Sequence, residues 1–450
     1  MDEARTEETA ELLQAMIRNA CVNDGSPESG QEERNVRTLA DFLDTAGVPL
    51  QVYESAPGRA SLVARIEGSD PDAAALCLMG HTDVVPVNPA RWSRDPFGGE
   101  RVGNEIWGRG AVDMLNLTAS MAVAFRQLGR SGFRPRGPLI FLAVADEEAG
   151  SRHGLRWMAD HHADDIRTGQ VLTESGGLHG GPAQARTVGI ALAEKGVAWR
   201  RLRVHGTPGH GSTPFKADNA LVTAAAVVQR LQAYRPAPAL PSFWASQVER
   251  LDLDDATKKL LLDPAAIDEQ LDLMPRASVA PYLHACTHTT FSCNTIAPGG
   301  ATPFKANVIP DTVDLGVDVR TLPGEGWQEV DSHLRAALGD LYDRVDVEVL
   351  MDDRASMSPM ATPLWRSLQR AVDAQFPGTQ LAPDLIVGFT DSRIYRELGA
   401  TSYGAGLFSP SLEPGEYSLR FHGNDERIDI ESLGLTTQLW LDVARDVLGS

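Results

Sequence analysis

Two apolar runs limit the folds open to this chain more than any other feature of the sequence. Ala73–Met79 is a continuous apolar stretch that stops at Gly80, and Pro138–Ala145 is a second stretch of this kind. Short, uniformly apolar runs are typical of strands buried on both faces, as in parallel sheets. A helix is expected between them at about Leu117–Leu128, and a third strand at Gln170–Thr173. This alternation predicts an α/β layer, mostly parallel, with helices on both faces.

From about residue 197 the pattern changes to one of α+β type. The predicted elements are, in chain order, a strand at Val197–Val204, a helix at Ala217–Ala233, strands at Thr287–Cys293 and Val313–Val319, a helix at Gln328–Leu341 and a strand at Val345–Leu350. The order β-α-β-β-α-β predicts a ferredoxin-like layer. A Pro-containing, partly helical segment at about 236–286 is interpreted as an insertion that lengthens this layer.

A chain of 450 residues is too long for one compact core, so several domains are expected. We expect residues 1–196 and 351–450 to form two parts of one large domain, with residues 197–350 inserted as a small one. A small domain inserted into a larger one is the simplest architecture that fits the two patterns.

Composition excludes several classes of partner and location. A formal charge of −20 argues against nucleic acid, although arginines and metal ions can still attract an anionic substrate into a cleft. No apolar run reaches about 18 residues, so no membrane span is expected. The acidic N-terminus lacks the features of a secretory signal, which predicts a cytoplasmic protein. Four scattered cysteines without a CxxC pair indicate neither a disulfide framework nor a thiolate zinc site.

Polar residues follow the predicted strands. His81 and Asp83 end the first strand, and a metal-binding histidine commonly donates its second ring N–H to a carboxylate. Asp113 ends a glycine-rich loop before a helix, where capping is an equal alternative. Glu147 and Glu148 follow the second strand. Adjacent acids usually mark a solvated turn, yet cations would neutralise them, leaving one to ligate and the other to act as a general base.

Two more candidates complete a metal-ligand set. Glu174 ends the third strand, and His422 lies near the C-terminus. Each alone is more simply a structural residue. Together the five predicted ligands balance charge, since two zinc ions carry four positive charges against three carboxylates and one hydroxide. Manganese or cobalt could substitute. Neither H-E-x-x-H nor G-x-S-x-G occurs, which weakens a serine-hydrolase interpretation. The five are His81, Asp113, Glu148, Glu174 and His422.

At this point the chain resembles the metallohydrolase family of aminoacylase, acetylornithine deacetylase, succinyl-diaminopimelate desuccinylase and glutamate carboxypeptidase. The matching stretches are GHTDVVP (80–86), GRGAVDM (108–114), DEEAGSRHG (146–154), LTESGG (172–177), TPGHGSTPF (207–215), NVIPDTVDLGVDVR (307–320), GFTDSR (388–393) and FHGNDE (421–426). They follow the family order over nearly the whole chain. The resemblance implies a zinc-hydrolase catalytic domain and an inserted lid or dimerisation domain.

The resemblance also implies roles for particular residues. One zinc would be bound by His81 and Glu174, the other by Glu148 and His422, with Asp113 bridging. Asp83 would orient His81, and Glu147 would be the general base. The implied substrate-binding residues are His210, which in many relatives comes from a partner subunit, Asn307, Arg320 and Arg393. Arginine offers a planar match to a free carboxylate.

These features predict a co-catalytic two-zinc amidohydrolase or peptidase. Its substrate would be an N-acyl amino acid or a dipeptide-like molecule with a free carboxylate, and it could dimerise through the inserted domain. Two alternatives stay open: a zinc hydrolase of another C–N bond, ureido or aryl-amine, and a metal-binding relative without turnover. The metal ligands do not distinguish the first alternative from amide hydrolysis, because they activate water whatever bond it attacks.

Overall fold

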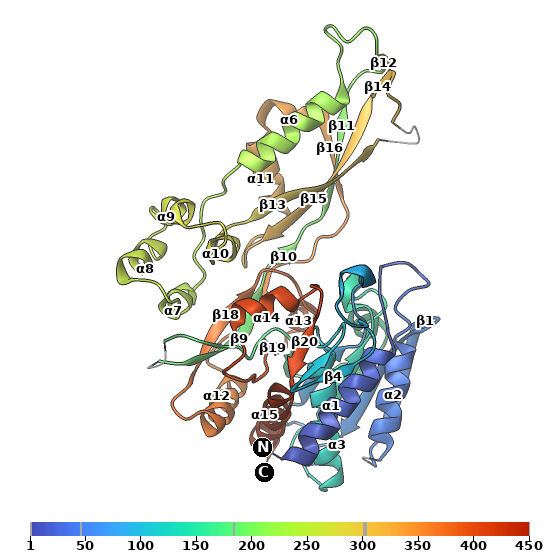
Figure 1. The fold of residues 1–450 in the computed structure, drawn as a ribbon, viewed down its shortest axis with the longest axis vertical. Helices are drawn as coiled ribbons and strands as arrows, with labels where there is room; N and C mark the ends of the chain where they lie inside the picture. Colours follow the sequence, from blue (N-terminus) through green and yellow to red (C-terminus); the bar gives the residue numbers. More distant parts are fainter. Residues whose placement is uncertain (1, 46, 183–184, 300–303, 450) are drawn as a thin grey trace.

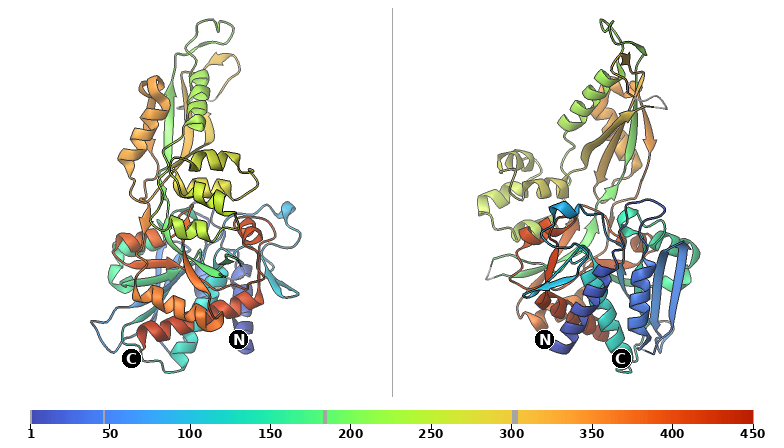
Figure 2. Two further views of the ribbon diagram at one scale, coloured as in Figure 1. Left: turned by 90° about the vertical axis from the view of Figure 1, so that its left-hand side faces the viewer. Right: turned by 45° about the vertical axis from the view of Figure 1, so that its right-hand side comes forward.

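The computed structural model describes residues 2–45, 47–182, 185–299 and 304–449. They form a large unit, which carries both ends of the chain, and a narrower small unit that stands on it (Figure 1). Figure 2 shows the same stacking from two other directions. No helix in these ranges is long and apolar enough to cross a membrane.

A ten-stranded sheet forms the centre of the large unit. Its main path is β1 (Leu50–Ala56), β2 (Arg59–Ile66), β6 (Leu139–Val144), β3 (Leu76–His81), β7 (Gln170–Thr173), β19 (Thr401–Gly404), β9 (Thr187–Glu194) and β17 (Ser356–Met357), with β8 (His179–Gly180) and β18 (Gln380–Ile386) also paired to β9. The neighbours β6, β3, β7 and β19 run parallel. The predicted α/β fold with a mostly parallel sheet is therefore confirmed.

Strand β3 is buried on both faces of the sheet, which explains its continuous apolar run. All six of its residues are buried. Because side chains alternate between faces, Leu76 and Leu78 join one core, whereas Cys77 and Met79 join another on the opposite face. Helices cover both faces. The first core contains α1 (Glu3–Arg18), α3 (Leu115–Arg130) and α15 (Ile430–Leu448), and the second contains α4 (Leu155–His161) and α13 (Ser392–Glu397).

The small unit has an antiparallel sheet with two helices. Its strands lie in the order β13 (Thr290–Pro298), β15 (Thr312–Thr321), β11 (Arg200–His205) and β16 (Val345–Val349), and β10 (Gly196–Val197) also pairs with β15. Alternate residues of β15 are buried against α6 (Ala220–Ala233) and α11 (Trp327–Leu338), as the period-two pattern predicts. At the far end, β12 (Gly209–His210) pairs with β14 (Val308–Ile309).

Segment 236–286 does not lengthen the small unit, and that prediction was wrong. It forms α7 (Trp244–Glu249), α8 (Asp255–Leu261), α9 (Ile267–Leu273) and α10 (Ala280–Thr287). Its apolar side chains, including Trp244 and Leu283, join the core of the large unit. The Lys195 ammonium group at the end of β9 donates to the carbonyls of Ala285 (2.8 Å) and His288 (2.6 Å). The sequence indicated a partly helical segment, whereas nothing in it indicated which core would receive the helices.

Candidate metal centre

The five predicted ligands meet at one edge of the large sheet. His81 is the last residue of β3, Glu174 directly follows β7, and Glu148 lies in the short helix η2 (Glu147–Ala149) after β6. These three strands are parallel neighbours, so their carboxyl ends converge. Asp113 comes from the loop before α3. His422 follows α14 (Pro414–Arg420) and reaches the same place from the C-terminal part of the chain.

The ligands form two overlapping groups: His81, Asp113 and Glu174, and Asp113, Glu148 and His422. Within each group the candidate ligand atoms lie within 4.8 Å of one another. Asp113 belongs to both because Oδ1 is 3.3 Å from Nε2 of His81 and Oδ2 is 3.2 Å from Nε2 of His422. Each carboxylate oxygen thus faces a different histidine, which suits an acid that bridges two cations.

The three carboxylates of this cluster share only two histidines. Burial and the nearby Asp113 raise the pKa of the Glu148 carboxyl to about 7, and burial raises the pKa of Glu174 well above its usual range. Hydrogen bonds to Asp113 and Glu148 raise the pKa of His422 to about 10. Oε1 of Glu148 is buried without a hydrogen-bond partner among the described residues. Imidazole and carboxylate donors that need neutralising charge fit a pair of divalent cations.

Asp83 contacts the imidazole ring of His81 on the side of Nδ1. Nδ1 of His81 is 3.4 Å from the Asp83 carboxylate and 3.0 Å from its backbone oxygen. The carboxylate also accepts hydrogen bonds from the Asn23 side chain (2.8 Å) and the backbone N–H of Glu148 (3.2 Å). These contacts hold the ring with Nε2 toward the other ligands, as expected of a histidine supported from behind.

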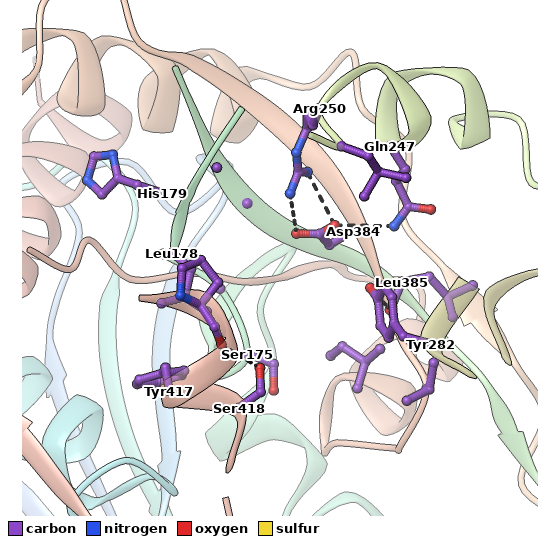
Figure 3. A pocket seen from close by; sticks show the side chains of 18 of the residues that line it. Ser175, Leu178, His179, Gln247, Arg250, Tyr282, Asp384, Leu385, Tyr417 and Ser418 are labelled. Atoms are coloured by element: carbon purple, nitrogen blue, oxygen red, sulfur yellow. Dashed lines mark hydrogen bonds and ion pairs between the residues drawn. The ribbon is translucent and has the colours of Figure 1, made fainter. Parts of the chain in front are cut away.

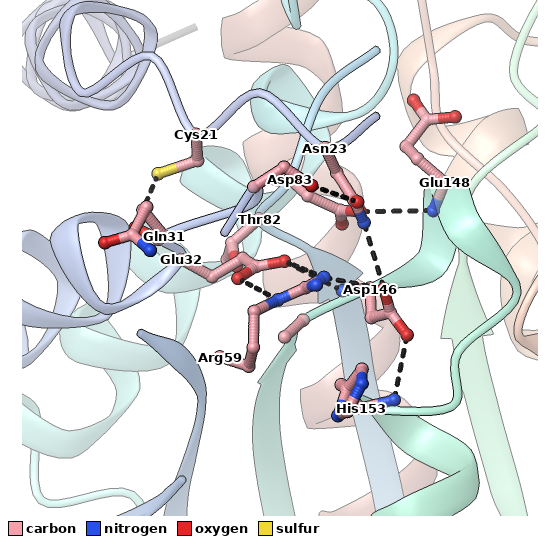
Figure 4. Close-up of polar contacts among 12 residues, drawn as sticks. Cys21, Asn23, Gln31, Glu32, Arg59, Thr82, Asp83, Asp146, Glu148 and His153 are labelled. Atoms are coloured by element: carbon pink, nitrogen blue, oxygen red, sulfur yellow. Dashed lines mark hydrogen bonds and ion pairs between the residues drawn. The ribbon is translucent and has the colours of Figure 1, made fainter. Parts of the chain in front are cut away.

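The turn that carries the two adjacent glutamates is held by a buried ionic network (Figure 4). Asp146 has a left-handed φ of 67° and accepts hydrogen bonds from Arg59 (2.6 Å) and from the backbone N–H of His153 (2.8 Å). Arg59 also donates to Glu32 at 2.7 and 2.8 Å. Sequence reasoning missed this network because its members lie far apart in the chain.

Glu426 positions the loop of Asp113. Its fully buried carboxylate accepts hydrogen bonds from the backbone N–H groups of Val112 (2.7 Å) and Asp113 (3.1 Å) and from the guanidinium of Arg109 (2.6 Å). Both the GRGAVDM and FHGNDE motifs were visible in the sequence. The sequence did not show that both motifs contact the Glu426 carboxylate, since only folding brings the two motifs together.

Glu147 differs from its neighbour Glu148 in its contacts. Its side chain is buried, yet its carboxylate forms no hydrogen bond or ion pair within the described part of the chain. Burial and the nearby Glu174 raise its pKa well above the usual range. A carboxylate that is free of partners and able to hold a proton is suited to proton transfer.

The two predicted arginines both lie close to one aromatic ring. The guanidinium carbons of Arg320 and Arg393 are 5.4 and 4.6 Å from the centre of the Phe389 ring. Arg393 is buried and donates to Asp353 (2.8 Å) and the Thr390 carbonyl (2.6 Å). Arg320 bonds Asp318, but its Nη1 is buried with no partner among the residues described. Arg320 therefore keeps a free donor, whereas Arg393 is largely occupied.

His210 and Asn307 lie elsewhere. They are adjacent, since the backbone N–H of Gly211 donates to the Asn307 carbonyl at 2.9 Å, and both are exposed. Figure 1 places β12 and β14 at the end of the small unit farthest from the large sheet. In this conformation the chain does not bring them to its own five ligands.

Residues 77–446 match the sequence model of peptidase family M20/M25/M40. The chain belongs to this family. It is 28% identical to N-fatty-acyl-amino acid synthase/hydrolase PM20D1 of Xenopus tropicalis, over 99% of this chain and 86% of that one. It is 26% identical to human aminoacylase-1, over 87% and 85% of the respective chains. This family membership, with the clustered ligand set, identifies a metal-dependent amide hydrolase.

Solved structures share the fold. The M20 family metallo-carboxypeptidase Sso-CP2 from Sulfolobus solfataricus superposes with a TM-score of 0.71 at 17% identity, covering 99% of each chain. Human carnosine dipeptidase 1 gives a TM-score of 0.66 at 17% identity, covering 98% of this chain and 97% of the other. The likeness thus extends over both units.

Proposed function

We propose that the chain is a two-zinc hydrolase of the amide bond in an N-acyl amino acid or dipeptide-like substrate with a free carboxylate. The observation that carries the proposal is the arrangement of Asp113, whose two oxygens each face a different histidine, beside the unpartnered Glu147. Names such as aminoacylase and carnosine dipeptidase among its relatives support this substrate class.

In this proposal His81 and Glu174 would hold one zinc, Glu148 and His422 would hold the other, and Asp113 would contribute to both sites. The bound ions would supply Lewis-acid chemistry, polarising the substrate carbonyl and making water more acidic. Imidazole and carboxylate ligands suit zinc, with manganese and cobalt as substitutes. Asp83 keeps Nε2 of His81 directed at the ligand cluster.

Glu147 moves protons in this mechanism. Its carboxylate accepts a proton from the water that attacks the carbonyl carbon. It then gives the proton to the amine nitrogen as the C–N bond breaks, which regenerates the carboxylate. Because burial raises its pKa, Glu147 can hold that proton between the two steps. Arg320 Nη1 would bind the free carboxylate of the substrate.

His210 and Asn307 are proposed to act in a homodimer. Their exposed position at the tip of the small unit would let them enter the site of a second copy, where His210 would donate a hydrogen bond to the developing oxyanion. The cytoplasmic location stays a prediction.

The test is a Glu147→Gln variant. We expect it to keep both metals in elemental analysis of dialysed protein and to lose about 100- to 10,000-fold in kcat, because the amide cannot take up the proton of water. Glu148→Gln is the matched control next to it and should lose metal. Turnover by Glu147→Gln at the wild-type rate would contradict the mechanism.

A substrate panel separates the remaining alternatives. Zinc-loaded protein is assayed with N-acetyl, N-succinyl and long-acyl amino acids, dipeptides, and ureido and aryl-amine compounds. Cleavage of the ureido or aryl-amine compounds alone would favour another C–N hydrolase. Two bound metals without any turnover would favour a non-catalytic relative.

A further inference from the structure

The large unit contains a cavity of about 670 Å³, whose lining side chains are drawn in Figure 3. Ser175 and Phe421 line it, and each is the chain neighbour of a predicted ligand, Glu174 and His422 respectively. Tyr417 also lines the cavity, and its ring centre lies 5.2 Å from that of Phe421. Two chain neighbours of the predicted ligands thus lie in its wall, which places the cavity next to the ligand cluster.

The 236–286 segment builds one wall of this cavity. Leu251, Tyr282 and Leu283 of the segment line the cavity. In Figure 3, Leu178 of the large unit lies across the space from Tyr282 and the neighbouring Leu385. The Tyr282 hydroxyl donates to the backbone carbonyl of Leu385 at 3.1 Å, which fixes the segment against β18. Because these walls are mainly apolar, they favour an apolar ligand.

A polar cluster bounds the cavity on the side away from the ligands. Arg250 and Gln247 each donate to the Asp384 carboxylate at 3.2 Å. In Figure 3 these three side chains lie across the cavity from Ser175 and Ser418. An apolar group would gain little by reaching them, since it would cover polar atoms without bonding to them. The cluster therefore limits how deep such a group extends.

We propose that this cavity binds the acyl part of the substrate and that the acyl group is a long, apolar chain. This inference rests on the proposed function, which places the scissile carbonyl at the ligand cluster. From there the acyl chain would pass Ser175 and lie between the loop that contains Leu178 and the wall that the 236–286 segment and β18 form together. Arg320 does not line the cavity, so the amino acid carboxylate stays outside it. A volume of this size is within the range of small-molecule sites and is far larger than an acetyl group requires.

The test measures kcat/KM of the zinc-loaded protein with a series of N-acyl derivatives of one amino acid, from acetyl to dodecanoyl. Each buried methylene group is expected to improve binding by up to about fourfold. We expect kcat/KM to rise at least about 100-fold over the series. Leu251→Trp should remove most of that rise, because the larger ring fills the cavity.

Two further variants keep the test independent of folding. Ser418→Trp also fills the cavity, but from an exposed position, so it leaves the core intact. It should likewise remove most of the rise in kcat/KM with chain length. Leu273→Trp is the matched control, since Leu273 is 74% exposed in the same segment and does not line the cavity. Leu273→Trp should keep the full rise in kcat/KM with chain length. Equal loss in the control and in Leu251→Trp would overturn the assignment.

Calorimetry with Glu147→Gln protein separates this inference from the proposed function. Tighter binding of the dodecanoyl than of the acetyl compound, abolished by adding Ser418→Trp, supports the cavity assignment even if no amide is cleaved. A wild-type enzyme that cleaves amides with no dependence on chain length overturns the cavity assignment and leaves the proposed function intact.

Discussion

The different contacts of Glu147 and Glu148 depend on the residue before them. Asp146 holds a left-handed backbone conformation and is tied to Arg59, which also bonds Glu32. All three side chains of this network are at most 3% exposed. Removing the only cation of such a network leaves buried negative charges without a partner, which is costly. We infer that the network fixes the turn on which both glutamates stand.

Replacing Arg59 by Met tests this role. We expect the free energy of unfolding to fall by about 3–5 kcal/mol, measured by urea denaturation, because Glu32 and Asp146 lose their cation. Arg65→Met on the same strand is the control. Its ion pair with Glu67 is largely exposed, so it should cost less than about 1 kcal/mol. Equal losses in the two variants would show that the network has no special role.

At this scale the sequence predicted the ligands better than their supports. His81, Asp113 and Glu174 stand at strand ends or in a glycine-rich loop, so local pattern and family motif both pointed to them. Arg59 and Glu426 act through contacts with residues far away in the chain. Local sequence patterns carry no information on such contacts, and only the fold reveals them.

Among the elements, β19 has a direct effect on the metal centre. It pairs in parallel with β7, the strand that Glu174 directly follows. Its last residue is Gly404, and a Cβ atom there would lie 1.9 Å from the backbone oxygen of Glu174. Since backbone cannot swing aside as a flexible side chain can, any larger residue must push the ligand away from its position.

Gly404→Ala should therefore weaken both stability and metal binding. We expect a loss of about 3 kcal/mol in the free energy of unfolding and less than the wild-type metal content after dialysis. Gly415→Ala serves as the comparison, because a Cβ atom at Gly415 meets nothing within 4 Å. Metal content equal to wild type in Gly404→Ala would show that Glu174 can move without consequence.

Element prediction succeeded where the side-chain pattern was uniform. Strands β3, β6 and β7 were predicted within three residues of their observed bounds, because buried parallel strands are apolar throughout. Strand β18 was missed. It contains Pro383, which argues against a strand by itself. Its place beside β9 depends on tertiary pairing that the sequence does not display.

At the scale of the whole molecule, bound cations should decide how stability depends on pH. In the metal-free protein the pKa of Glu148 rises from 4.5 to about 7, and that of His422 from 6.5 to about 10. Folded protein then binds more protons than unfolded chain between these values, so stability falls as pH rises. The Glu148 contribution is complete below pH 4.5 and lost by about pH 7.

We therefore expect chelated protein to melt at least roughly 5 °C lower at pH 8 than at pH 5.5. Zinc should raise the melting temperature more at pH 8, because the cations replace the protons that the cluster has lost. Glu148→Gln, measured after chelation, should show a weaker pH dependence. A melting temperature that rises with pH in the chelated protein would contradict the assignment of these charges.

The distance between His210 and the ligand cluster makes the oligomeric state a matter of mechanism. His210 is exposed at the tip of the small unit, while Glu147 is buried in the large one. If each site takes Glu147 from one copy and His210 from the other, a mixed dimer can rebuild one intact site. A site supplied by a single chain cannot be rebuilt in this way.

Mixing two inactive variants distinguishes these cases. His210→Ala and Glu147→Gln are each expected to lose at least about 100-fold in kcat. After joint refolding, half of the dimers carry one copy of each, and one of their two sites is intact. Activity should then recover to roughly a quarter of the wild-type value, with light scattering showing a dimer. If the mixture stays as inactive as its components, His210 must reach Glu147 within one chain, by a movement of the small unit toward the large one.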